Sequence, residues 1–208
     1  ASGTSTVLTL AKAFMEGTQK PKRSILFLLV TAEEQGLLGS AYYAQHPIYP
    51  TTQTVAALNM DGMNIHGAMK DITITGYGQS ELETMAEEIG KTQGRYVLPD
   101  QEPEKGFYFR SDHFNFAKVG IPAINAKGGY DHWEKGRAYA MEQKKIYTYS
   151  HNHRPSDEFR PDEWDFAGMI QDMELYYRLG TKLANSKDWP SWKEGSEFKA
   201  ARVADGRN

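Results

Sequence analysis

Two apolar segments, each followed at once by acidic residues, constrain this chain more than any other feature. Residues 24–31 (SILFLLVT) lead into Glu33 and Glu34, and residues 54–60 (TVAALNM) lead into Asp61. Such apolar runs predict strands that are buried on both faces, as in a sheet covered by helices. Open α/β sheets bind ligands at the carboxyl ends of their strands. The acids therefore mark a candidate site at one edge of a sheet.

Adjacent carboxylates at such an edge are costly to desolvate unless a cation or a proton neutralises them. The repeated pattern favours a metal site with a general base beside it. The alternative is a solvated pair of acids at a helix start, where the macrodipole favours negative charge. The chain has no cysteine, so any metal ligands must be His, Asp or Glu.

Composition restricts the class of protein. A chain of 208 residues has the length of one domain or slightly more, and we expect a single domain over residues 1–208. Its formal net charge of -3 gives no reason to expect a nucleic-acid or anionic-membrane partner. No apolar run approaches the roughly 20 residues that a transmembrane helix needs.

Helical and strand-like periods alternate along the chain, which predicts an α/β sandwich. The segment near residue 71 follows Asp61 too closely for a helical crossover and predicts one antiparallel pairing. Residues 127–152 have weak periodicity and predict a long active-site loop. Residues 186–208 predict a polar tail, with Trp192 and Phe198 as docking points. Strands are expected at 24–31, 55–61, 71–75 and 121–125, and helices at 7–15, 37–45, 81–92, 111–119 and 162–184.

The histidines supply the remaining ligand type. His151 and His153 flank Asn152, and alternate residues of an extended segment point the same way, so either or both could face a site. A surface position is the alternative for such a pair. Ser111, Asp112 and His113 spell a serine-hydrolase triad, but three consecutive residues cannot converge on one reaction centre. The chain also lacks a G-x-S-x-G elbow, a His-Glu-x-x-His helix and a Gly-rich phosphate loop.

Four segments resemble, in order and spacing, consecutive signatures of the di-zinc aminopeptidase family (peptidase family M twenty-eight). They are residues 24–40 (SILFLLVTAEEQGLLGS), 58–62 (LNMDG), 110–123 (RSDHFNFAKVGIPA) and 151–158 (HNHRPSDE). The Lys-Arg entry to the first strand and the Trp-containing tail resemble the bacterial branch with an upstream protease-associated domain. The resemblance implies a three-layer α/β sandwich with a mixed, mostly parallel sheet. It also implies two zinc ions, peptide substrates and a periplasmic or secreted location.

The resemblance assigns roles to individual residues. It implies that Glu33 is the general base, that Glu34 and His153 bind one zinc ion, and that Asp61 binds the other. Many members carry a tyrosine just before the last zinc histidine, where this chain has Asn152. Substrate contact is expected for Arg110 and supporting roles for Ser111, Asp112 and Asp157.

The family carries further zinc ligands in a segment that precedes an Ala-Ser-Gly like the one at Ala1. The resemblance therefore implies that the amino-terminal portion of the catalytic domain is missing. Such a fragment is expected to bind metal poorly and to be inactive alone. Two other functions remain open within the same resemblance. One is a glutaminyl-cyclase-like acyltransferase, and the other is a non-catalytic, receptor-like interaction domain.

Overall fold

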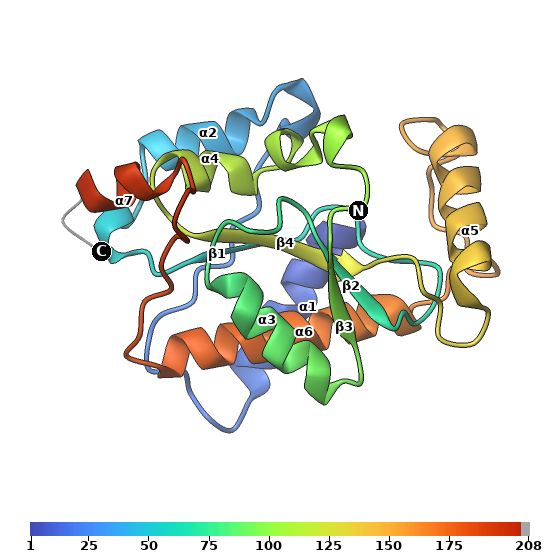
Figure 1. Ribbon diagram of the computed structural model, residues 1–208, viewed down its shortest axis with the longest axis horizontal. Coiled ribbons are helices and arrows are strands. Elements are labelled where there is room, and N and C mark those ends of the chain that lie inside the picture. The colour runs from blue at the N-terminus through green and yellow to red at the C-terminus, as the bar shows by residue number, and fades with distance from the viewer. Residues whose placement is uncertain (205–208) are drawn as a thin grey trace.

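The computed structural model describes residues 1–204 and confirms the predicted α/β architecture (Figure 1). Helices and strands alternate along most of the chain, with short 3-10 turns between them. In chain order the elements are α1 Ser2–Glu16, η1 Glu33–Gln35, α2 Leu38–Gln45, η2 Thr51–Gln53, β1 Ala57–Asn59, β2 Asp71–Ile74, α3 Leu82–Thr92, β3 Tyr96–Pro99, η3 Pro103–Lys105, η4 Phe107–Arg110, α4 His113–Lys118, β4 Ala123–Gly128, α5 Gly136–Ser150, α6 Ala167–Asn185 and α7 Lys199–Ala204.

Within the described residues four strands form one mixed sheet in the order β1-β4-β2-β3. Strands β1 and β4 run parallel, with Asn59 opposite Asn125. Strands β2 and β3 are also parallel to each other. The predicted antiparallel pairing is confirmed between β2 and β4, where Ile74 lies opposite Ala126. The carboxyl ends of β1 and β4 consequently meet at one edge of the sheet.

Helices cover both faces of this sheet and complete three layers. Helices α1, α3 and α6 lie on one face, α2 and α4 lie on the other, and α5 stands beyond one end of the sheet (Figure 1). Apolar stripes of α3 and α6 meet the strands in one core, which includes Ile72, Leu82, Ile124, Leu175 and Leu179. Burial of such side chains stabilises the fold by about 1.5–3 kcal/mol each.

Two buried polar side chains of α6 hold the sheet together. The Tyr176 hydroxyl donates to the Asn59 carbonyl at 2.7 Å and accepts the Ala126 amide at 2.8 Å, so it bridges β1 and β4. Asp172 accepts the Gly128 amide at 2.8 Å and pairs with Arg95 at 2.8 Å. Both partners of that ion pair are inaccessible to solvent.

Residues 24–31 do not form the predicted buried strand. Residues 24–30 have no strand structure, and Leu26 and Leu29 are 46% and 52% exposed. The segment makes no ladder with β1, the edge strand of the described sheet. Apolar composition favours an extended strand, but a strand is stable only where its backbone groups find partners. Phe27 alone is packed against the core, beside Phe14.

Residues 127–152 are not the predicted long loop, because α5 occupies most of them. Only Ala140 of this helix is buried. The sequence therefore has no buried apolar stripe at helical spacing that would predict the helix. Helix α6 begins at Ala167 and not near residue 162, because the backbone around Asp165 bonds to the segment Ile65–Gly67 instead. Strand β3 was not predicted at all.

Two aromatic side chains of the carboxyl-terminal segment are buried against the domain. Trp192 and Phe198 are 3% and 6% exposed and pack with Tyr108 in a second apolar cluster. The Trp192 indole donates to the Gly120 carbonyl at 2.9 Å. Residues 205–208 of the predicted tail lie outside the described residues.

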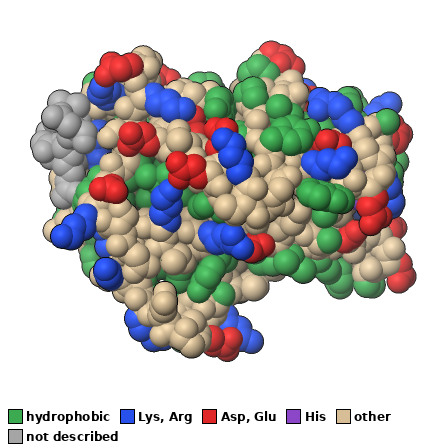
Figure 2. Space-filling model, turned by 60° about the horizontal axis from the view of Figure 1, so that its bottom comes forward, with side chains coloured by type: hydrophobic (Ala, Val, Ile, Leu, Met, Phe, Trp, Pro, Cys, Tyr) green, Lys and Arg blue, Asp and Glu red, His purple; other side chains and the backbone are tan. Residues whose placement is uncertain are grey.

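Acidic and basic side chains are interspersed with apolar ones over the face seen in Figure 2. This mixture agrees with the small net charge of the chain. Among the helices formed by residues 1–204, none combines the length and the apolar character that crossing a bilayer requires.

Candidate functional site

Glu33 and Glu34 lie in η1, a single turn with left-handed backbone on both sides. The φ angles are 57° at Ala32, 100° at Gly36 and 60° at Leu37. This conformation costs a residue with a side chain roughly 1–2 kcal/mol, so the surrounding structure must hold it. The Leu37 amide donates to the Glu33 carbonyl at 2.8 Å and closes the turn. The turn leaves Glu33 half-buried and Glu34 exposed.

The surroundings of Glu33 favour its protonated form. Burial is the largest cause, and the nearby carboxylates of Asp61 and Glu34 add to it. Asp112 acts in the same direction, His153 opposes it, and the pKa of Glu33 is raised to about 7. A carboxyl group with that pKa can both accept and return a proton near neutral pH.

The raised pKa of Glu33 predicts a pH dependence of stability. Between pH 4.5 and about 7 the folded, metal-free protein binds more protons at Glu33 than the unfolded chain does. Its free energy of unfolding therefore decreases as pH rises through this window. We expect Glu33→Gln to remove this slope and to stabilise the protein by about 1 kcal/mol above pH 7, because solvent screens part of the charge.

Urea unfolding at several pH values, with a chelator present, measures this effect. The exposed Glu142 of α5 provides the matched control, and Glu142→Gln should retain the wild-type slope. An identical slope in wild type and Glu33→Gln would show that Glu33 does not carry the pH dependence.

Glu34 meets His153 across the site. The Nε2 atom of His153 lies 2.8 Å from Oε1 of Glu34, and the two side chains are 65% and 63% exposed. At that exposure the ion pair contributes little to stability. Both side chains can therefore leave the pair at little cost and bind a ligand instead. His151 lies elsewhere, with Nδ1 2.8 Å from Nη1 of Arg160. The structure thus places His153, and not His151, beside the acids.

Asp61 follows β1 and is oriented by a short chain of hydrogen bonds. Ser111 Oγ donates to Asp61 Oδ2 at 2.9 Å, and Asn59 Nδ2 donates to Ser111 Oγ at 2.8 Å. No sequence pattern singles out Asn59 as a site residue. The alternation of a strand could have revealed it, because Asn59 and Asp61 are two residues apart and share one face.

Asp112 and His113 do not form a triad with Ser111. Asp112 accepts a hydrogen bond from Ser40 Oγ at 2.5 Å, and burial raises the pKa of Asp112. The His113 ring is fully buried edge-on against Tyr108, and burial lowers its pKa to about 4. The sequence-based exclusion of a nucleophilic serine agrees with this arrangement.

Arg110 and Asp157 are the remaining predicted residues. Arg110 ends η4 with an exposed side chain. Asp157 accepts the Tyr147 hydroxyl at 3.0 Å on both of its oxygens. Lys127, which no sequence pattern singles out, donates to the Gly62 carbonyl at 2.8 Å near Asp61, and burial lowers its pKa.

The donors present suit zinc in kind, but too few of them converge. Glu34 and His153 offer one carboxylate oxygen and one imidazole nitrogen, which are ordinary zinc ligands. Across residues 1–204 no three His, Cys, Asp or Glu side chains are grouped so that they could hold one metal ion. A catalytic zinc ion normally takes three protein ligands and one open position. Glu34 and His153 by themselves fall short of that number of ligands.

The sequence profile of Peptidase family M28 matches residues 1–178, a span that includes all the candidate site residues. The chain belongs to this family. A vacuolar membrane protease of Pyricularia oryzae is 42% identical to the M28 chain over 60 residues, which are 29% of this chain and 6% of that protease.

Several solved structures share the fold. A peptidase M28 precursor from Shewanella amazonensis superimposes with a TM-score of 0.61 at 20% identity, over 90% of this chain and 37% of that one. An aminopeptidase from Aneurinibacillus superimposes with a TM-score of 0.60 at 19% identity, over 90% of this chain and 40% of that one. The M28 chain thus spans less than half the length of these solved relatives.

Proposed function

We propose that this M28 chain carries the catalytic base and zinc ligands of a metal-dependent aminopeptidase. The observation that carries the proposal is the environment of Glu33, whose pKa of about 7 is set by burial and by the neighbouring acids. Membership of a peptidase family supports hydrolysis of peptide bonds. A structural neighbour that is an aminopeptidase supports action at the amino terminus. The proposal includes a periplasmic or secreted location, expected from the family resemblance.

Three residues of this chain would hold metal. Glu34 and His153 would bind one zinc ion, and Asp61, oriented by Ser111, would bind the other. Further ligands are needed to complete either site. When bound, two zinc ions would polarise the scissile carbonyl and lower the pKa of the attacking water.

Glu33 would take a proton from the attacking water and deliver it to the nitrogen of the leaving amine. This use of one group as base and then as acid favours a pKa near the working pH, and in the metal-free chain burial and the neighbouring acids raise that of Glu33 to about 7. The acids around Glu33 would attract the positive amino terminus of the peptide. Arg110, exposed beside Ser111, would contact the substrate.

The full-length protein is expected to hydrolyse an aminoacyl-nitroanilide that has a free amino group. The N-acetylated substrate should react at least about 10²-fold more slowly, because the acids then lose their cationic partner. A chelator should abolish hydrolysis and added zinc should restore it. Release of nitroaniline, followed by absorbance, measures both effects.

Each competing function predicts a different result. Equal cleavage of the free and acetylated substrates would exclude an aminopeptidase. Cyclisation of an amino-terminal glutamine with release of ammonia would indicate an acyltransferase. Absence of either reaction in the zinc-loaded protein would favour a non-catalytic domain.

A further inference from the structure

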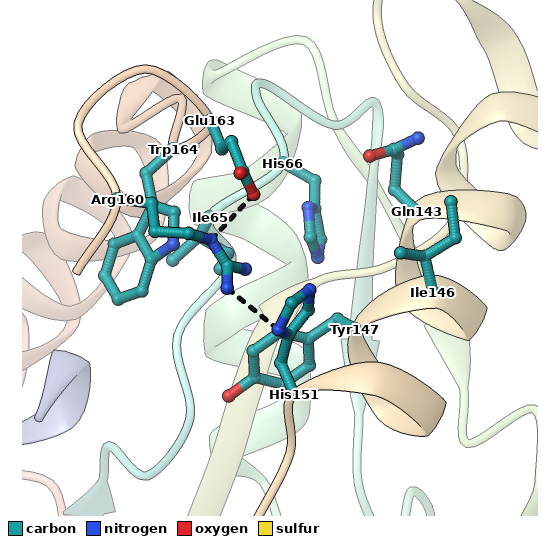
Figure 3. A pocket seen from close by; sticks show the side chains of 9 residues that line it. All are labelled: Ile65, His66, Gln143, Ile146, Tyr147, His151, Arg160, Glu163 and Trp164. Atoms are coloured by element: carbon teal, nitrogen blue, oxygen red, sulfur yellow. Dashed lines mark hydrogen bonds and ion pairs between the residues drawn. The ribbon is translucent and has the colours of Figure 1, made fainter. Parts of the chain in front are cut away.

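A cavity of about 270 Å³ lies between α5, the loop after β1 and the segment that joins α5 to α6 (Figure 3). It is smaller than the roughly 300–1,000 Å³ of sites for drug-sized ligands, and so suits a group the size of one residue. His151 lines it, and His153, two residues further along, meets Glu34. The cavity is therefore a neighbour of the candidate site but is lined by other side chains.

Arg160 supplies a fixed positive charge at this cavity. Its Nε atom lies 2.7 Å from Oε2 of Glu163, and its Nη1 atom donates to the Ser156 carbonyl at 2.9 Å and to His151 Nδ1 at 2.8 Å. The third nitrogen, Nη2, is turned toward His66 and the cavity (Figure 3). A guanidinium group stays protonated in proteins, so this nitrogen offers donors at every ordinary pH.

The contact with Arg160 also fixes the proton of His151. Because arginine can only donate, Nδ1 of His151 must accept, and the proton of the neutral ring lies on Nε2. Figure 3 shows both His151 and His66 among the side chains that line the cavity. Burial lowers the pKa of His66, so its ring is neutral near pH 7 and keeps one N–H donor.

Glu163, which is paired with Arg160, and Gln143 also line the cavity, and the remaining wall is apolar. Ile65, Ile146, Tyr147 and Trp164 contribute aliphatic and aromatic surface. The cavity thus combines N–H donors and the ion pair of Arg160 and Glu163 with apolar surface. A carboxylate attached to an apolar side chain complements both parts, because guanidinium and carboxylate form strong charge-assisted hydrogen bonds.

We infer that this cavity binds the carboxyl-terminal residue of a short peptide whose amino end lies at Glu33 and Glu34. His151 lines the cavity and His153 meets Glu34, and their Cα atoms are at most about 7.6 Å apart, so the cavity adjoins the acids. An extended peptide spans about 3.3–3.6 Å per residue, and a short one would reach from one to the other. Acids at one end and Arg160 at the other complement the two charges of such a peptide. The inference rests on the proposed function.

Binding tests the cavity without any need for turnover. N-acetyl-leucine carries a carboxylate and an apolar side chain but no free amine, and N-acetyl-leucine amide lacks the charge. By calorimetry the acid should bind at least about 10-fold more tightly than the amide. Acetate should bind more weakly than the acid, because it cannot use the apolar wall.

Variants of α5 and Arg160 sharpen this test. Arg160→Gln should remove the preference for the acid over the amide. Ile146→Trp should fill the cavity and weaken binding about 10-fold or more, and it keeps the test decisive if Arg160→Gln disturbs the loop. Met141→Trp is the matched control, because Met141 is exposed on the same helix and does not line the cavity. Equal binding of acid and amide, or unchanged binding by Ile146→Trp, would overturn the inference.

Turnover in the full-length, zinc-loaded protein provides a second test. The ratio of kcat/KM for the dipeptide Leu-Leu to that for its carboxyl-terminal amide should exceed about 10, and it should fall toward 1 in Ile146→Trp but not in Met141→Trp. A ratio near 1 in an active wild-type enzyme overturns the inference and leaves the proposed function intact. If neither substrate is cleaved, the proposed function fails, and the binding of N-acetyl-leucine still decides the cavity.

Discussion

Glu33→Gln is expected to lower kcat of the full-length protein on an aminoacyl-nitroanilide by about 10²–10⁴-fold. Glutamine has nearly the same shape as glutamate but cannot accept the proton of the attacking water. The zinc content should remain that of the wild type, because Glu33 is not a proposed ligand. Steady-state kinetics together with metal analysis of the same sample measures both quantities.

Its neighbour provides the matched control. Glu34→Gln should lower the zinc content itself, because Glu34 and His153 are proposed to share one ion. His153→Ala should do the same, whereas His151→Ala should retain the metal because His151 bonds to Arg160. Loss of zinc in Glu33→Gln with full zinc in Glu34→Gln would reverse the two roles.

Asp172→Ala is expected to lower the free energy of unfolding by about 3–5 kcal/mol. The change leaves the guanidinium of Arg95 buried without its carboxylate, and it removes the acceptor of the Gly128 amide. An unpaired charge in the interior is far more costly than the pair was favourable. Urea denaturation of the metal-free chain measures the loss.

The exposed pair of Glu87 and Lys91, 2.9 Å apart on α3, serves as a comparison. Glu87→Ala should change stability by no more than about 0.5 kcal/mol, because solvent already screens that pair. Replacing both buried partners, as Arg95→Met with Asp172→Leu, should recover part of the loss. Equal effects of Asp172→Ala and Glu87→Ala would contradict our view of the interior.

The sequence predicted those helices whose buried apolar residues recur at a regular spacing. Helices α3 and α6 turn an apolar stripe to the core, and that stripe recurs every three or four residues. Helix α5 was not predicted, because it buries a single alanine. The segment 24–31 was wrongly predicted to be a strand, because an apolar run reports side-chain preference and not the presence of a neighbouring strand.

The candidate site shows a similar division. Its main candidate residues, Glu33, Glu34 and Asp61, stand out in the sequence because they come just after apolar segments. The support of Asp61 by Asn59 and Ser111 joins segments far apart in the chain, and only the folded structure brings them together. The environment that raises the pKa of Glu33 likewise depends on tertiary contacts that no local pattern contains.

The left-handed backbone at Ala32 and Leu37 has a consequence for engineering. Glycine at either position would remove the local backbone strain. It would also make the turn more flexible, and this turn keeps Glu33 half-buried and Glu34 exposed. Substitutions there that raise the melting temperature would risk changing the relative positions of the Glu33 and Glu34 carboxylates. The outer face of α5, away from its cavity-lining side, is a safer place for stabilising substitutions. Its exposed residues can change without moving η1.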